Sequence, residues 1–226
     1  MNSTGMVISL AFGLGMLHAL DADHIMAVSS LASGGHKARR AWHYAQRWAL
    51  GHGLSLSLIG TCVYLLGSAI PTELSIMAER LVGVILILMG LYAILGLWRQ
   101  RLHIHFHHHD GLPAHAHLHA HPVGSVSTVH GHVHRATLLG LLHGTAGSAP
   151  LLVLIPIASL GSPWLALLYL LVFSLGVLLA MSLFGGLLGW GIGQCLRRGR
   201  AYVRVLHGGV ALGTLWAGLV VLSHAG

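Results

Sequence analysis

The chain has 226 residues, of which 55% are apolar and only 8% are charged. A soluble domain carries about 25% charged residues, so the composition excludes an ordinary soluble fold and indicates that lipid is the solvent. The net charge of +7 does not indicate a nucleic-acid partner, because the basic residues cluster between apolar segments.

Six apolar segments are long enough to cross a bilayer, for which about 20 residues are needed. They run approximately over Gly5–Ala32, His43–Ile70, Met77–Trp98, Thr137–Leu160, Trp164–Gly191 and Tyr202–His224. We therefore expect an all-α polytopic membrane protein with six transmembrane helices. Five tryptophans near the predicted span ends are interpreted as an aromatic belt at the membrane surfaces: Trp42, Trp48, Trp98, Trp164 and Trp190.

The first span carries an ionisable cluster, His18, Asp21, Asp23 and His24, between apolar flanks. Such groups inside a membrane cost about 3 kcal/mol each on insertion scales, and they normally face a partner or a cavity. A divalent cation would offset this cost, because it pairs with carboxylates and binds neutral imidazole nitrogen. The mixture of ligands favours a first-row transition metal over magnesium or calcium. A purely structural role is the alternative.

An unbroken helix cannot bring His18 and His24 to one ion. At about 100° per residue their side chains are roughly 240° apart, and they lie about 9 Å apart along the axis. Either the helix unwinds near Ala19–Asp23, or only some of the four residues bind. His18 with Asp21, or Asp21 with His24, would share one face of a continuous helix.

Two further histidines of the predicted spans are candidate site residues. His52 stands between two glycines, which would allow another backbone to approach closely. His143 is followed by Gly144, Gly147 and Pro150, which disfavour a continuous helix and form the interrupted segment expected at a transporter site. Taken singly, either histidine could instead be a partner in helix packing.

A polar, repetitive segment, Arg99–Arg135, holds 12 of the 20 histidines. It lacks a hydrophobic period, so we expect a flexible loop. Its histidines are interpreted as weak metal-buffering ligands, although a solvated linker is the alternative. The residues assigned to buffering are His107, His108, His109, His115, His117, His119 and His121.

Lys and Arg flank the first, third and fifth loops between the predicted spans, whereas the second and fourth loops are not basic overall. The positive-inside rule places the odd-numbered loops in the cytoplasm. Both termini are then expected outside, the histidine-rich loop is cytoplasmic, and the membrane is a cytoplasmic (inner) membrane of bacterial type.

The chain also repeats itself. Leu14–His18 matches Leu139–His143, and Gly51 matches Gly176, all at an offset of 125 residues. A repeat unit of three spans is odd, so the second copy enters the membrane from the opposite side, as in the inverted repeats of secondary transporters. The expected organisation is a first repeat over residues 1–98, the loop over residues 99–135, and a second repeat over residues 136–226.

The motifs resemble a known family. The segment LHALDADHI, Leu17–Ile25, resembles the signature motif of the nickel/cobalt transporter (NiCoT) family, and LGHGLSL, Leu50–Leu56, resembles its second motif. The segment LLHGTAGSAPLL resembles the shorter urease-accessory-type nickel permeases of that superfamily, and the histidine-rich loop resembles that of its efflux members. The resemblance implies five candidate metal ligands or selectivity residues: His18, Asp21, Asp23, His24 and His52. The interrupted segment after His143 adds that histidine as a sixth candidate.

We therefore predict a transporter of Ni²⁺ or Co²⁺, with uptake slightly favoured over efflux, that needs no cofactor beyond the transported ion. Its expected partners are the ion, the lipid bilayer and a cytoplasmic metallochaperone. A membrane thiol-electron carrier is a distant alternative, because Cys62 and Cys195 are 133 residues apart (195 − 62) and miss the repeat register. Both cysteines are interpreted as packing residues. An intramembrane metallo-enzyme ranks last, since no HExxH motif occurs.

Overall fold

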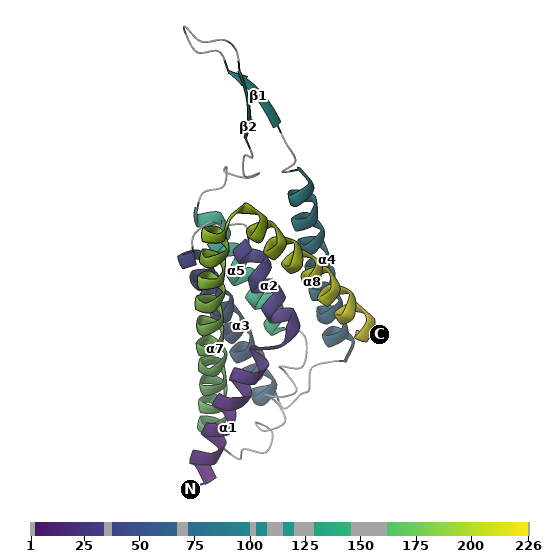
Figure 1. Ribbon diagram of the computed structural model, residues 1–226. Helices are drawn as coiled ribbons and strands as arrows, with labels where there is room; N and C mark the ends of the chain where they lie inside the picture. Colours follow the sequence, from purple (N-terminus) through teal and green to yellow (C-terminus); the bar gives the residue numbers. More distant parts are fainter. Residues whose placement is uncertain are drawn as a thin grey trace.

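The computed structural model describes residues 3–33, 38–66, 72–99, 103–107, 115–119, 129–145 and 162–225. Its helices are α1 (Ser3–His18), α2 (Ala22–Ser33), α3 (Ala38–Leu66), α4 (Thr72–Arg99), α5 (Val129–Gly144), α7 (Pro163–Arg198) and α8 (Arg200–His224), and its strands are β1 (His103–His107) and β2 (His115–His119) (Figure 1).

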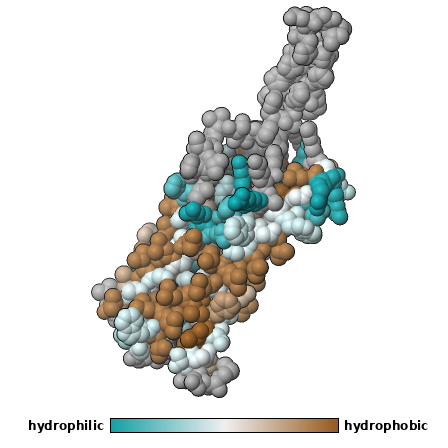
Figure 2. Space-filling model, turned by 90° about the vertical axis from the view of Figure 1, so that its left-hand side faces the viewer, coloured by the Kyte–Doolittle hydropathy of each residue, from teal (hydrophilic) through white to brown (hydrophobic). Residues whose placement is uncertain are grey.

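Within these residues, α3, α4, α7 and α8 are long and apolar enough to cross a membrane. The pair α1 and α2 counts as a fifth, broken span that bends by 57°. Apolar residues cover much of the face drawn in Figure 2, as expected where lipid rather than water is the solvent. The protein is an integral membrane protein with helical spans.

The fourth predicted span is described only in part. Its first residues form the end of α5, which begins earlier than expected, at Val129. Beyond Thr145 the predicted span lies outside the described residues, and so do Gly147 and Pro150. The predicted interruption of this span therefore stays a prediction.

The first span breaks between its two halves. Ala19 and Leu20 form a turn after His18, and α2 begins at Ala22. The backbone N–H groups of Leu20 and Asp21 donate to carbonyls three residues earlier, at 3.0 and 3.1 Å, which tightens the last turn of α1 before the chain changes direction. Unwinding near Ala19–Asp23 was one of the two outcomes that the helical geometry left open, and the structure shows it.

Glycines allow close contact between helices of the two halves. A Cβ atom on Gly15 in α1 would overlap the backbone carbonyl of Phe173 in α7, and one on Gly140 in α5 would overlap the carbonyl of Trp48 in α3. The second contact repeats the first at an offset of 125 residues, since 140 − 15 and 173 − 48 both equal 125. The helices α1 and α7 therefore pack as α5 and α3 do.

A second pair of contacts follows the same relation. Gly51 in α3 lies against the carbonyl of Thr137 in α5, and Gly176 in α7 lies against the carbonyl of Phe12 in α1. The offset is again 125 for both members of each contact. The close backbone approach expected beside His52 is thus confirmed at Gly51.

The histidine-rich segment contains regular structure that the sequence analysis did not expect. Strands β1 and β2 pair antiparallel, and the register places histidine opposite histidine at three positions: His103 with His119, His105 with His117 and His107 with His115. The prediction of a flexible loop was wrong for these ten residues, because the alternation of histidine with other residues has the period of a strand. His108, His109 and His121 lie outside the described residues.

Figure 1 shows the hairpin beyond one end of the helices. The N-terminus lies at the opposite end of the molecule, and α8 carries the C-terminus away from the hairpin. The hairpin and the N-terminus therefore lie at opposite ends of the helical body.

Candidate metal site

The break in the first span brings together two histidines that a continuous helix would separate. His18 is the last residue of α1, and His24 lies in the first turn of α2. Their ring centroids are 4.5 Å apart, with the planes at 78°. Of the two possibilities that the helical geometry left open, the structure adopts the unwound one.

His52 joins this pair from α3. Its ring centroid lies 5.3 Å from that of His18 and 5.0 Å from that of His24. All three side chains are buried, and one nitrogen from each lies within 4.8 Å of the others. Imidazole nitrogens on one ion are about 3.4 Å apart, given bonds of about 2.1 Å, so a small inward movement of the rings would complete a three-nitrogen site.

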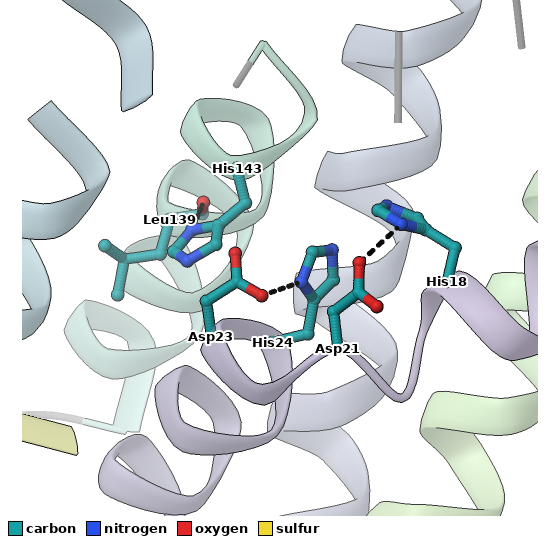
Figure 3. A network of polar contacts seen from close by, with 6 residues as sticks. All are labelled: His18, Asp21, Asp23, His24, Leu139 and His143. Atoms are coloured by element: carbon teal, nitrogen blue, oxygen red, sulfur yellow. Dashed lines mark hydrogen bonds and ion pairs between the residues drawn. The ribbon is translucent and has the colours of Figure 1, made fainter. Parts of the chain in front are cut away.

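The two carboxylates lie against Nδ1 of His18 and of His24. The Nδ1 atom of His24 donates to Asp23 Oδ1 at 2.8 Å, and Nδ1 of His18 lies 2.9 Å from Asp21 Oδ2 (Figure 3). With Nδ1 carrying the proton, Nε2 of His24 keeps its lone pair, which is the arrangement of metal-ligating histidines. Both Nε2 atoms are buried and lack a hydrogen-bond partner within the described part of the chain.

His143 reaches the same cluster from α5. Its ring centroid lies 5.7 Å from that of His24. Nδ1 of His143 donates to the Leu139 carbonyl oxygen at 2.9 Å, so this ring also keeps an unprotonated Nε2. The structure therefore brings together all four histidines of the predicted intramembrane site, each from a different helix.

The two predicted carboxylates lie beside the histidines. One oxygen each from Asp21 and Asp23 comes within 4.8 Å of a His24 nitrogen and of the other oxygen. The Asp21 side chain is 43% exposed and that of Asp23 is 23% exposed, whereas the His18 side chain is only 1% exposed. The acids thus form the more accessible edge of a buried imidazole cluster.

Trp48 was interpreted as part of an aromatic belt, and this was wrong. Its side chain is 0% exposed, and its ring stacks on that of His52, with centroids 5.0 Å apart and planes at 17°. The edges of His24 and His143 meet it at 4.8 and 5.5 Å. The spacing of four residues between Trp48 and His52 places them on one helix face and could have signalled the contact.

Phe173 was also missed. Its ring centroid lies 5.8 Å from that of His18, and it occupies in α7 the position that Trp48 occupies in α3. His18 beside Phe173 and His143 beside Trp48 are thus equivalent contacts at the offset of 125. The internal match of Leu14–His18 with Leu139–His143 carried this signal.

A family model described as "Cytochrome C biogenesis protein transmembrane region" matches residues 23–216, which is more than half of the chain. The chain belongs to this family. The resemblance to nickel/cobalt transporters named a different family, so membership of the cytochrome C biogenesis transmembrane family is a finding that the motifs alone did not indicate.

A second comparison agrees with the urease-accessory branch of that resemblance. This member of the cytochrome C biogenesis transmembrane family is 35% identical over 97 residues to the urease accessory protein UreH of Bacillus sp. (strain TB-90). The aligned region covers 43% of the chain and 42% of UreH, so the chain spans less than half the length of this relative. No solved structure matches the chain.

Proposed function

We propose that the protein moves a divalent transition-metal ion, Ni²⁺ or Co²⁺, across the membrane, with uptake as the favoured direction. The observation that carries the proposal is the convergence of buried imidazoles on His24. His18, His24 and His52 come from three helices and offer nitrogens within 4.8 Å of one another, directly beside two carboxylates.

A bound metal ion would offset the free-energy cost of burying these polar side chains in the membrane. Carboxylates and unpaired imidazole nitrogens in the apolar part of a membrane protein cost free energy unless a partner compensates them. A divalent ion neutralises the acids and takes the Nε2 lone pairs. Imidazole with carboxylate suits a first-row transition metal, so the proposed ligand set is His18, Asp21, Asp23, His24 and His52, with His143 completing or gating the site.

Inverted-repeat architecture would allow the ion to pass. The glycine contacts at an offset of 125 residues support two units of three spans related by an inverted repeat. In this arrangement the histidine cluster lies where the units meet, because His143 comes from the second unit and the other ligands from the first. Rocking of one unit against the other would then expose the ion alternately to the two sides.

Nickel is preferred as the ion because two indications agree. The motif resemblance implies urease-accessory-type nickel permeases, and UreH is named as a urease accessory protein. In the proposed orientation, the β1–β2 hairpin lies on the cytoplasmic side of a bacterial inner membrane and both termini lie outside. An imported ion would meet the paired histidines of the hairpin before a cytoplasmic metallochaperone takes it.

Electron transfer through thiols is the second candidate, because the family name concerns cytochrome C biogenesis. Both cysteines are free, and Cys62 is exposed rather than packed as expected. Gly60, two residues before Cys62, packs against Leu170 of α7. Cys195 follows Leu170 by 25 residues (195 − 170) of the same helix, which is about 38 Å. The two thiols are too far apart to exchange a disulfide, so the metal proposal is favoured.

Accumulation of radiolabelled nickel by whole cells tests the proposal. Cells with the wild-type protein are compared with cells carrying Asp23→Ala or His24→Ala, and with His224→Ala as a control at an exposed histidine outside the site. Uptake predicts that only the two site variants accumulate less nickel, whereas efflux predicts that they accumulate more. Equal accumulation in all four strains, at equal protein levels, would reject the site.

A further inference from the structure

The potential ligands divide into two groups that share one residue. His18, His24 and His52 form an all-nitrogen group, and Asp21, Asp23 and His24 form a group dominated by oxygen. In each group the ligand atoms lie within 4.8 Å of one another. His24 is the only residue common to both, so a single imidazole connects two different coordination environments.

The two groups differ in accessibility. Every member of the nitrogen group is buried, and His52 is 0% exposed. In the oxygen group, the Asp21 and Asp23 side chains are 43% and 23% exposed. An ion that approaches from water therefore meets carboxylates first and can reach His18 and His52 only after it has lost most of its water.

The two groups also differ in chemistry. Carboxylates bind Mg²⁺, Mn²⁺ and the later transition metals alike, whereas imidazole favours Ni²⁺, Co²⁺, Cu²⁺ and Zn²⁺. A hard cation would gain little on moving from the acids to the nitrogen group. A later transition metal would gain more, because it exchanges oxygen ligands for nitrogen ligands.

We propose that the site consists of two adjoining subsites that share His24, an outer carboxylate subsite that captures divalent cations broadly and an inner imidazole subsite that selects among them. This inference rests on the proposed function. The ion passes inward by exchanging the carboxylates for His18 and His52, with His24 as the residue common to both subsites. After the transfer, Asp23 remains the acceptor for the Nδ1–H group of His24, and Asp21 remains beside Nδ1 of His18.

Two cations separate the subsites experimentally: Mn²⁺, followed by electron paramagnetic resonance, reports the outer subsite, and Co²⁺, followed by its visible absorption, reports the inner one. Full-length protein is used with the histidines of the Arg99–Arg135 segment replaced by asparagine, so that they do not bind either probe. The variants are His52→Ala, which removes an inner ligand, and Asp21→Asn, which keeps the size of the side chain while the charge is lost.

We expect His52→Ala to weaken Co²⁺ binding at least tenfold and to remove its intense visible band, with Mn²⁺ binding changed less than threefold. Asp21→Asn should weaken Mn²⁺ binding at least tenfold and Co²⁺ binding less than threefold. His18→Asn provides a second inner variant if His52→Ala does not fold. Parallel losses of both cations in each variant would show one undivided site and overturn the inference while leaving the proposed function intact. Failure of the unsubstituted site to bind either cation would overturn both.

Discussion

The indole ring of Trp48 stacks on the imidazole of His52, with centroids 5.0 Å apart and planes inclined by only 17°. Both side chains are 0% exposed. The stack restricts rotation of the His52 ring, and the same indole contacts the edges of His24 and His143. One aromatic side chain thus touches three of the four clustered histidines.

Replacing this indole should disturb transport without removing a ligand. Trp48→Ala leaves a large cavity beside three imidazoles, which costs about 3–5 kcal/mol of stability in a packed core, and it frees His52 to turn. We expect nickel accumulation to fall at least fivefold, while Trp48→Phe retains more than Trp48→Ala. Trp164→Ala is the matched control, since that ring is 80% exposed. Equal loss in the Trp164 variant would show that the effect is not specific to the cluster.

The equivalent glycine contacts predict equivalent destabilisation in the two halves. In Gly15→Ala and Gly140→Ala the new methyl group meets a backbone carbonyl of a neighbouring helix, so each should lower stability by about 1–3 kcal/mol, as overpacking does. Gly13→Ala and Gly193→Ala meet open space and serve as controls. Thermal unfolding of the purified protein measures the effect, and unchanged midpoints for both packed positions would contradict the described packing.

The hairpin register predicts that nickel binds outside the membrane core as well. Cross-strand neighbours lie about 5 Å apart at Cβ, a separation that suits two imidazoles on one ion. Replacing the three β1 histidines by asparagine should lower the number of Ni²⁺ ions bound per chain by at least one in calorimetric titration. A variant with Ile104→Thr and Phe106→Tyr keeps those histidines and should bind as wild type does. An unchanged stoichiometry in the first variant would reject buffering by this hairpin.

Because the two cysteines lie far apart, we predict that neither thiol is needed for nickel transport. A Cys62→Ser, Cys195→Ser double variant should accumulate nickel as wild type does, because neither residue lies in the histidine cluster. Loss of activity in the double variant at normal protein levels would instead revive the electron-carrier alternative. Alkylation of wild-type cells offers an independent check, since Cys62 is exposed.

Sequence reasoning found the clustered ionisable residues better than it found their surroundings. Asp21 and Asp23 stand out because acids are rare in apolar segments, and the angle between His18 and His24 already made an unwound helix one of two outcomes. The packing of Trp48 escaped prediction because its position near the polar start of a span also fits an aromatic belt. Whether an indole faces lipid or the core depends on which helices become neighbours. The residues close to the indole in the sequence do not determine this.

The β1–β2 hairpin was missed for a different reason. Histidine alternates with apolar residues in His103–His107 and His115–His119, which is the period of a strand. The many histidines led us to interpret the segment as a low-complexity loop instead. The internal repeat, in contrast, could be seen in the sequence. If the matched segments are equivalent, their helices should make the same contacts, and the glycine contacts do recur at the same offset.

The central claim is that a metal ion ligated by the buried imidazoles makes this intramembrane cluster tolerable. X-ray absorption at the nickel edge, on full-length protein whose loop histidines are replaced by asparagine, tests it most directly. The account predicts at least two imidazole nitrogens at about 2.1 Å, with fewer in His52→Ala. A spectrum with only oxygen ligands, unaltered by His24→Ala and His52→Ala, would contradict it.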